Sequence, residues 1–234
     1  MTSFRYDPEL LAAFPTIRAG ILRATIAENG PTPPPLQEAF RREQEAVLAR
    51  LGDTSLAALP SIAAWRRAFT AFGVKPTQYR SAAEALLRRL TKVGEIPNIS
   101  LLVDLGNLVS IRYALPVAIF DTRAIEGGLT VRFATGNERF MDLGTETIEH
   151  PQPGEVIFAD EAGWVHARRW CWRQSQASAV SPTTTSLLIV TEGHHDAAQQ
   201  DTRAALADLL SLLEAQGAAT GDSALLSPNA PLFP

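Results

Sequence analysis

The stretch that most constrains the fold is residues 96–121, IPNISLLVDLGNLVSIRYALPVAIFD, the most apolar and least charged part of the chain. Its spacing predicts a helix that ends just before Pro116 and is followed by a buried strand, because proline interrupts a helix. A helix that is apolar on nearly all sides belongs in a core. The only polar strip on it consists of Ser100, Asp104 and Asn107, which recur at helical spacing.

This polar strip allows two interpretations. Buried carboxylates and amides cost free energy unless they are hydrogen-bonded. In the first interpretation, Asp104 and Asn107 hold neighbouring backbone in place, which is the usual role of such groups. In the second, Asn107 faces a ligand pocket. The sequence leaves both open.

The pattern of elements predicts an α+β fold with a central β-layer and helices packed against it. Helix formers and apolar spacing predict helices over residues 36–51 and 60–72, a helix opened by the capping box Ser81 to Glu84, and a last helix over 197–216. Alternation predicts one or two short strands within residues 10–26, followed by strands at 117–120, 129–133, 155–159, 164–172 and 185–191. Helices followed by strands, without strict alternation, are typical of α+β proteins.

Proline and glycine divide the chain. The run Gly-Pro-Thr-Pro-Pro-Pro at residues 30–35 is stiff, since proline fixes φ and lacks an amide donor. We therefore expect an N-terminal segment over residues 1–35, with short strands and a proline-rich hinge. The main domain then covers residues 36–216. Residues 217–234 are rich in alanine, glycine, serine and proline and are expected to form a flexible tail.

Composition narrows the environment and the partners. The formal net charge is −4, so any contact with nucleic acid must use a local basic patch. Cys171 is the only cysteine, which excludes an internal disulfide. The N-terminus lacks an apolar signal core, and the apolar run over residues 99–111 is too short to cross a bilayer. We expect a cytoplasmic protein with no membrane association.

The common catalytic motifs are absent. The sequence contains neither a GxxxxGK[ST] phosphate loop nor a GxSxG elbow, and one cysteine cannot build a thiolate zinc site. His194-His195-Asp196 resembles a metal-binding run, but adjacent histidines diverge on regular backbone, and Asp196 has the position of an N-cap for the last helix. No metal and no cofactor is expected, and no catalytic residue can be assigned.

Two features point to ligand contact. In a strand over residues 164–172, Arg168, Trp170 and Trp172 would share one face, with Arg173 beside them. Aromatic rings flanked by arginine can stack on bases or on a ligand ring. Two tryptophans, however, more often pack in a core or in a protein–protein interface. Glu192 ends the following strand, where a carboxylate can bind a polar group of a substrate.

A set of short segments resembles the editing domain of the phenylalanyl-tRNA synthetase β chain, and the chain looks like a freestanding member of that group. The resemblance extends from about residue 62 to residue 193 and implies an α+β fold. In the synthetase this domain hydrolyses tyrosine wrongly attached to the phenylalanine tRNA. The segments are Lys75-Pro76, Tyr79-Arg80-Ser81, Glu84, Pro97-Asn98-Ile99-Ser100, Val103-Asp104, Asn107, Pro116, Phe120-Asp121 and Val131-Arg132-Phe133-Ala134.

The resemblance assigns roles position by position. The family's pocket uses a threonine–asparagine pair on the helix, where this chain has Gly106 and Asn107. The family histidine two residues before the Phe-Asp pair is replaced by Ala118. In the family, a carboxylate near the end of the domain binds the tyrosine hydroxyl, and Glu192 is its counterpart in this chain. The resemblance thus implies Asp104, Asn107 and Glu192 as substrate-pocket candidates.

Three functions are compatible with the sequence. The first is an aminoacyl-tRNA deacylase acting in trans, with aminoacyl-tRNA as partner. The second is a non-catalytic module that binds an amino acid, a related small molecule or RNA, which the absent histidine favours. The third is a structural partner that uses its tryptophan face. The chain lacks the parts needed for a complete tRNA ligase, and its oligomeric state is not predicted. Candidate contacts to tRNA or ligand are Arg80, Arg88, Arg89, Arg168, Trp170, Trp172 and Arg173.

Overall fold

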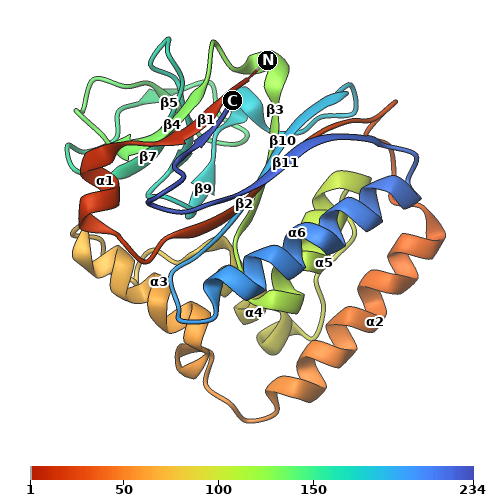
Figure 1. The fold of residues 1–234 in the computed structure, drawn as a ribbon. Coiled ribbons are helices and arrows are strands. Elements are labelled where there is room, and N and C mark those ends of the chain that lie inside the picture. Colours follow the sequence, from red (N-terminus) through yellow and green to blue (C-terminus); the bar gives the residue numbers. More distant parts are fainter. Residues whose placement is uncertain (1) are drawn as a thin grey trace.

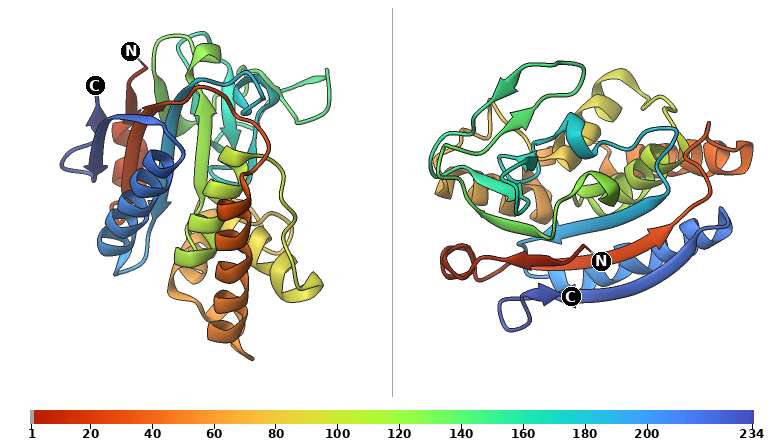
Figure 2. Two further views of the ribbon diagram at one scale, coloured as in Figure 1. Left: turned by 90° about the vertical axis from the view of Figure 1, so that its right-hand side faces the viewer. Right: turned by 90° about the horizontal axis from the view of Figure 1, so that it is seen from above.

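The computed structural model describes residues 2–234. Its strands form two β-sheets that face each other across an apolar interior, and a layer of helices covers the outer face of the smaller sheet (Figures 1 and 2). This arrangement confirms the predicted α+β fold.

The smaller sheet is antiparallel throughout and has the strand order β11-β2-β10-β3. The larger sheet has the order β12-β1-β4-β7-β8-β9, in which only β1 and β4 run parallel. The smaller sheet consists of β2 (Arg18–Thr25), β3 (Val117–Asp121), β10 (Ser186–Gly193) and β11 (Ala219–Leu226). The larger consists of β1 (Phe4–Tyr6), β4 (Leu129–Phe133), β7 (Val156–Ala159), β8 (Val165–Arg168), β9 (Arg173–Gln174) and β12 (Leu232–Phe233), and a separate hairpin pairs β5 (Phe140–Met141) with β6 (Ile148–Glu149).

The helices confirm most of the predicted ranges. They are α1 (Pro8–Ala13), α2 (Pro34–Leu51), α3 (Pro60–Ala71), α4 (Ala82–Val93), α5 (Leu101–Tyr113) and α6 (Ala198–Ala215), with short 3-10 turns η1 (Leu56–Ala58), η2 (Thr122–Ala124) and η3 (Gln176–Ser178). The predicted capping box forms at α4, where the amide of Glu84 donates to Oγ of Ser81 at 3.3 Å. Asp196 does not cap α6 as predicted, since the N-cap is Ala197 and no side-chain capping hydrogen bond forms there within residues 2–234.

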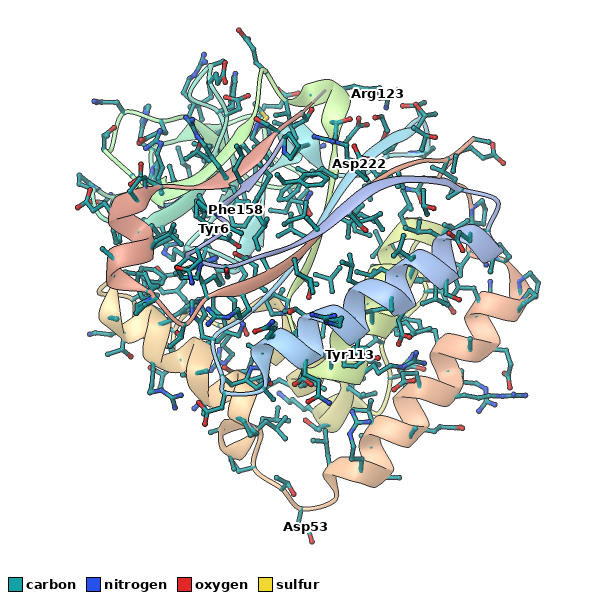
Figure 3. The ribbon with its side chains drawn as sticks, in the orientation of Figure 1. Tyr6, Asp53, Tyr113, Arg123, Phe158 and Asp222 are labelled. Atoms are coloured by element: carbon teal, nitrogen blue, oxygen red, sulfur yellow. The ribbon has the colours of Figure 1, made fainter. Side chains whose placement is uncertain are left out.

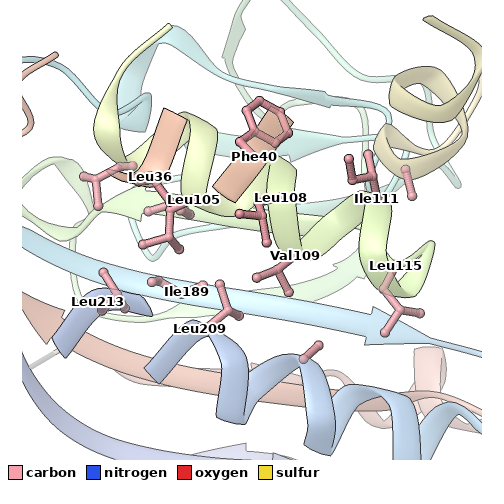
Figure 4. Packing of buried hydrophobic residues seen from close by; sticks show 14 of the residues in the cluster. Leu36, Phe40, Leu105, Leu108, Val109, Ile111, Leu115, Ile189, Leu209 and Leu213 are labelled. Carbon is pink, nitrogen blue, oxygen red and sulfur yellow. The ribbon is translucent and has the colours of Figure 1, made fainter. Parts of the chain in front are cut away.

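Helix α5 is buried on nearly every side, as its apolar sequence predicts. It lies beside α6 on the smaller sheet, and α2 and α4 pack on its other sides. Figure 4 shows Val109 of α5 pointing toward β10, where Ile189 of that strand and Leu209 of α6 lie, while Leu36 and Phe40 of α2 lie on the opposite side of α5. Burial on this scale makes α5 the centre of the helical layer.

Strand β10 separates two apolar clusters. All its residues after Ser186 are buried, and alternate side chains point to opposite faces of the sheet. Leu187 and Ile189 join the cluster under the helices, whereas Leu188 and Val190 join the aromatic cluster between the sheets. Because of this alternation, each later side chain of β10 points either toward the helices or toward the space between the sheets.

The ends of the chain differ from the predicted division into segment, domain and tail. Strand β2, from the first 35 residues, pairs on one side with β10 and on the other with β11, which lies beyond residue 217. Phe4 and Phe233 pair across β1 and β12, and both are buried. Apolar residues inside these segments find partners in the sheets, so residues 2–35 and 217–234 are built into the same fold.

The predicted strand over residues 164–172 is wrong in its second half. Strand β8 ends at Arg168, and Arg169 and Trp170 follow with φ of 45° and 61°. These left-handed conformations break the alternation, so Arg168, Trp170 and Trp172 do not share a strand face. Within residues 2–234, no helix combines the length and the apolar character needed to cross a bilayer.

Candidate functional site around Glu192

Glu192 lies near the end of β10 on the inner side of the smaller sheet. Alternation along the strand puts it on the same face as Leu188 and Val190, toward the larger sheet. The residue is 3 % exposed. A carboxyl group is therefore buried in the aromatic cluster, where it needs specific partners.

The two hydrogen bonds to Glu192 both reach the same oxygen. The Tyr6 hydroxyl donates to Oε1 at 2.6 Å, and the Trp170 indole N–H donates to Oε1 at 3.0 Å. Among residues 2–234, none bonds Oε2. Burial raises the pKa of Glu192 to about 7, and the hydrogen bonds from Trp170 and Tyr6 only partly oppose that rise. Near neutral pH, Oε2 can therefore carry a proton or act as an acceptor.

The backbone after β8 brings Trp170 under Glu192. The positive φ values at Arg169 and Trp170 turn the chain inward, and the Trp170 amide bonds the carbonyl of Val156 at 2.6 Å. The ring is fully buried, with its centroid 5.3 Å from that of Trp65 and 5.0 Å from that of Phe14. These edge-on contacts fix the indole and thereby aim its N–H at the carboxyl.

A small cavity of about 70 Å³ opens beside this carboxyl. Its volume is several times the ~10–15 Å³ that one water needs. Phe158, one of its walls, and Tyr6 are labelled in Figure 3; they lie on β7 and β1 of the larger sheet, with β4 between these strands. The cavity is mainly apolar, and its lining includes Pro116, Ala118, Phe158, Ala167, Trp170, Cys171, Trp172, Gln174, Val190 and Glu192.

Ala118, at the family histidine position, is part of this lining. Ala118 pairs with Val190 across β3 and β10, two residues before Glu192 on the same face. The structure thus brings together the two positions that the resemblance marked as histidine and carboxylate. The alanine side chain leaves the cavity without a second ionisable group at that point.

A cationic and aromatic rim borders the cavity. The Arg169 guanidinium lies 3.9 Å from the ring centroid of Tyr79 and 4.5 Å from that of Trp172, and Arg173 lies 4.6 Å from the same Trp172 ring. Arg169 also pairs with Glu155 at 3.1 Å. Arg173 is paired with Asp142, as Arg169 is with Glu155. Cation–π contacts hold these side chains against one another, so the rim is an ordered set of aromatic rings and carboxylate-paired guanidinium groups.

Asp104 is bound into the start of α5. It accepts hydrogen bonds from the Thr32 hydroxyl at 2.5 Å, from the Asn98 side-chain amide at 2.7 Å and from the Ile99 backbone amide at 2.9 Å. These bonds tie the proline-rich stretch and the loop before α5 together. Asp104 therefore has the backbone-holding geometry of the first interpretation, and it does not line the Glu192 cavity.

Asn107 and Gly106 are also separate from this cavity. Asn107 is half-buried on α5 and is not part of the lining. At Gly106, a Cβ atom would lie 3.2 Å from Cδ1 of Ile119, so α5 packs closely on β3 there. A threonine at this position would require Ile119 to shift. The structure therefore does not bring Asn107 and Glu192 into one pocket.

The candidate contact residues are distributed over several places. Trp170, Trp172 and Arg173 line the cavity. Arg168 is 6 % exposed and pairs with two glutamates, Glu155 at 3.0 Å and Glu149 at 2.6 Å, which makes it a structural residue.

The other three candidates lie on or just before α4. Arg80 is half-buried and lies 3.6 Å from the carboxylate of Glu84. Arg88 and Arg89 are exposed on α4, and neither belongs to the lining of the Glu192 cavity.

Sequence reasoning missed Tyr6 and Arg169. Tyr6 is 186 residues from its partner Glu192, and no local pattern couples two residues across that distance. Arg169 was missed because an unbroken strand was expected there. The left-handed turn that brings its side chain to Tyr79 contains neither glycine nor asparagine, the residues that usually indicate such a turn.

Comparison with known proteins places the chain in a family. The sequence matches the B3/4 domain family over residues 64–211, more than half of the chain. It is 33 % identical over 89 residues to the phenylalanine–tRNA ligase beta subunit of Chromobacterium violaceum, covering 38 % of this chain and 11 % of that protein. The corresponding subunit of Bradyrhizobium diazoefficiens is 38 % identical over 80 residues, covering 34 % and 10 %.

A solved structure is also similar. An N-terminal fragment of the phenylalanyl-tRNA synthetase beta subunit from Pyrococcus horikoshii aligns with 93 % of this chain and 49 % of its own, with a TM-score of 0.47 and 13 % identity. The chain matches only about a tenth of the length of the two ligase subunits. On the match over residues 64–211, the chain belongs to the B3/4 domain family.

Proposed function

We propose that this chain acts in trans on aminoacyl-tRNA as a deacylase, with the amino-acid side chain bound in the Glu192 cavity. The observation that carries the proposal is a buried carboxyl group with one oxygen engaged twice and the other free beside an apolar cavity. The names of the ligase subunits that share its family support tRNA as the partner.

Recognition would depend on the free oxygen of Glu192. A side chain with a terminal hydroxyl, such as tyrosine, can donate to Oε2 while its ring contacts the apolar walls formed by residues such as Phe158 and Val190. A side chain without that hydroxyl would leave a buried polar oxygen unpaired. Sites built to hydrogen-bond a hydroxyl reject analogues that lack it by about 10⁴-fold or more.

Hydrolysis would depend on positioning, because Ala118 supplies no base. Water attacks the ester carbonyl and gives up a proton, and the bond to the ribose oxygen breaks. That oxygen takes up the proton from the water and leaves as the 2′- or 3′-hydroxyl of the tRNA. Holding water and ester in contact accounts for much of such a barrier. The rim of Arg169, Trp172 and Arg173 offers an aromatic face and guanidinium groups, each paired with one carboxylate, to the acceptor end.

Release of amino acid from charged tRNA tests the proposal. The purified chain is mixed with tRNAs carrying correct and incorrect amino acids, and free amino acid is measured over time. We expect release from at least one mischarged tRNA. Glu192→Gln should reduce it at least about tenfold, because the amide oxygen would take the place of Oε1 beside Tyr6 and Trp170 and an NH₂ donor would replace the free acceptor Oε2. Arg203→Ala, an exposed site on α6, serves as the control.

The alternative is a binding module without hydrolysis, which the alanine at position 118 favours. Absence of release over the whole panel, together with amino-acid binding that is lost in Glu192→Gln, would replace the deacylase by that module. Binding and release that are both unchanged in Glu192→Gln would remove the cavity from either function.

A further inference from the structure

A second, larger cavity lies on the helical side of the molecule. It has a volume of about 520 Å³ and opens between the ends of α2, α3, α5 and α6. Tyr113, one of its lining residues, is separated in Figure 3 from Tyr6 and Phe158 beside the first cavity. Its floor is aliphatic and includes Val47, Leu51, Leu87 and Ile111. The size is within the ~300–1,000 Å³ of small-molecule sites.

The imidazole of His195 lines this cavity and lacks one hydrogen-bond partner. Its side chain is 5 % exposed, and Nε2 lies 2.7 Å from Oδ2 of Asp201. Within residues 2–234, no group bonds Nδ1. A carboxylate can only accept from Nε2–H, so Nδ1 is the buried polar atom without a partner, and leaving such an atom unpaired is costly.

Ser61 is a second unpaired group in the lining. It is 5 % exposed and lies in the first turn of α3, and its hydroxyl bonds no other side chain or backbone group within residues 2–234. The first amides of α3 also have no partner inside the helix. Together with the positive end of the helix dipole, the hydroxyl and these amides suit a carboxylate.

Most charged groups around the cavity are already paired. Arg112 bonds Glu43 and Asp208, both at 2.7 Å, and Arg50 donates to the Arg112 carbonyl at 2.9 Å. Among the charged lining residues, Arg67 and Asp196 are exposed and make neither an ion pair nor a side-chain hydrogen bond within residues 2–234. One cation and one anion are thus available to a ligand.

From these groups we propose that the cavity binds a free α-amino acid with an aliphatic side chain. The carboxylate lies at Ser61, Arg67 and the start of α3. The ammonium faces Asp196 and the imidazole of His195, and the side chain rests on the aliphatic floor. The site is independent of the Glu192 cavity and of the proposed deacylation.

Calorimetric titration of the full chain with leucine tests this site. Two matched probes are 4-methylpentanoate, which lacks the ammonium, and 3-methylbutylamine, which lacks the carboxylate. We expect leucine to bind, and each probe to bind at least about tenfold more weakly, since each loses one charge-assisted contact. Arg67→Ala and Ser61→Ala should each weaken leucine binding about fivefold or more, and Arg203→Ala should leave it unchanged.

Three outcomes would overturn the proposal. They are no heat at millimolar leucine, equal binding of leucine and 4-methylpentanoate, and leucine binding that survives Arg67→Ala and Ser61→Ala but is lost in Glu192→Gln. The last result would assign leucine to the first cavity. Arg67 is exposed, so its variant remains informative even if Ser61→Ala unfolds, and circular dichroism verifies the fold of each.

Discussion

The Tyr6 hydroxyl donates a 2.6 Å hydrogen bond to Oε1 of Glu192, although β1 and β10 belong to different sheets. This bond connects the N-terminal strand to the candidate site. It also leaves Glu192 with its second oxygen free, since Trp170 bonds the same Oε1 at 3.0 Å. The properties of the site therefore depend on a residue far outside the helix that dominates the sequence.

Tyr6→Phe should raise the pKa of Glu192 above its value of about 7, because the hydrogen bond from Tyr6 stabilises the charged form. The loss of one buried hydrogen bond should also reduce the free energy of unfolding by about 1 kcal/mol. Carbon NMR titration of the carboxyl measures the pKa shift. Tyr113→Phe is the matched control, and a Glu192 pKa that moves equally in both variants would contradict the role of Tyr6.

The stability of the protein should fall as pH rises from about 4.5 to about 7 through the titration of Glu192. Its pKa is raised from 4.5 in an unfolded chain to about 7 in the folded state, so the folded state holds the proton more tightly. The stabilisation is complete below pH 4.5 and is lost through pH 7, with a total of about 3 kcal/mol.

Denaturation of wild type and Glu192→Gln at several pH values isolates this contribution. Subtracting one pH profile from the other removes the contributions of other titrating groups. One of these is His194, whose pKa burial lowers to about 3, so its titration makes the protein more stable as pH rises. Parallel pH profiles for the two proteins would show that Glu192 does not titrate in this range.

Trp65→Ala should lower the free energy of unfolding by about 3 kcal/mol or more, because it empties the centre of the aromatic cluster. Trp65 is 1 % exposed, and its ring lies edge-on to both Trp170 and His194. Chemical denaturation measures the loss, with Val93→Ala at an exposed position as control. An unchanged midpoint would be incompatible with this packing.

Ala118→His should increase release of amino acid from mischarged tRNA at least about tenfold, since a positioned base contributes roughly 10²–10⁴ to such rates. Ala118 lines the cavity, and its partner on the adjacent strand, Val190, lies two residues before Glu192. Ala58→His, an exposed site on η1, controls for an added histidine. Equal rates in both variants would mean that the cavity does not hold the ester.

Local patterns in the sequence predicted much of the fold. The α5–β3 stretch, the capping box at Ser81 and the alternation of β4 each follow from interactions over a few residues. The pairing of β2 with β10 and β11 depends on contacts between distant segments, and a tail rich in small residues gave no local indication of it.

The candidate site was predicted in part for the same reason. Glu192 could be singled out because it ends a strongly apolar strand, and Ala118 because of the family pattern. Asn107 was grouped with Glu192 by resemblance, yet it lies outside the cavity. Tyr6 and the turn at Arg169 depend on tertiary contacts and on left-handed backbone, which composition and spacing do not encode.

The position of β2 has a consequence for how the protein is made. Arg18 aligns with Gly193 and Ala19 with Leu226, so this strand acquires neither neighbour until most of the chain has left the ribosome. Until then, its apolar residues and both of its edges are open to other chains. The smaller sheet should therefore form late in synthesis, once β10 and β11 are available to pair with β2.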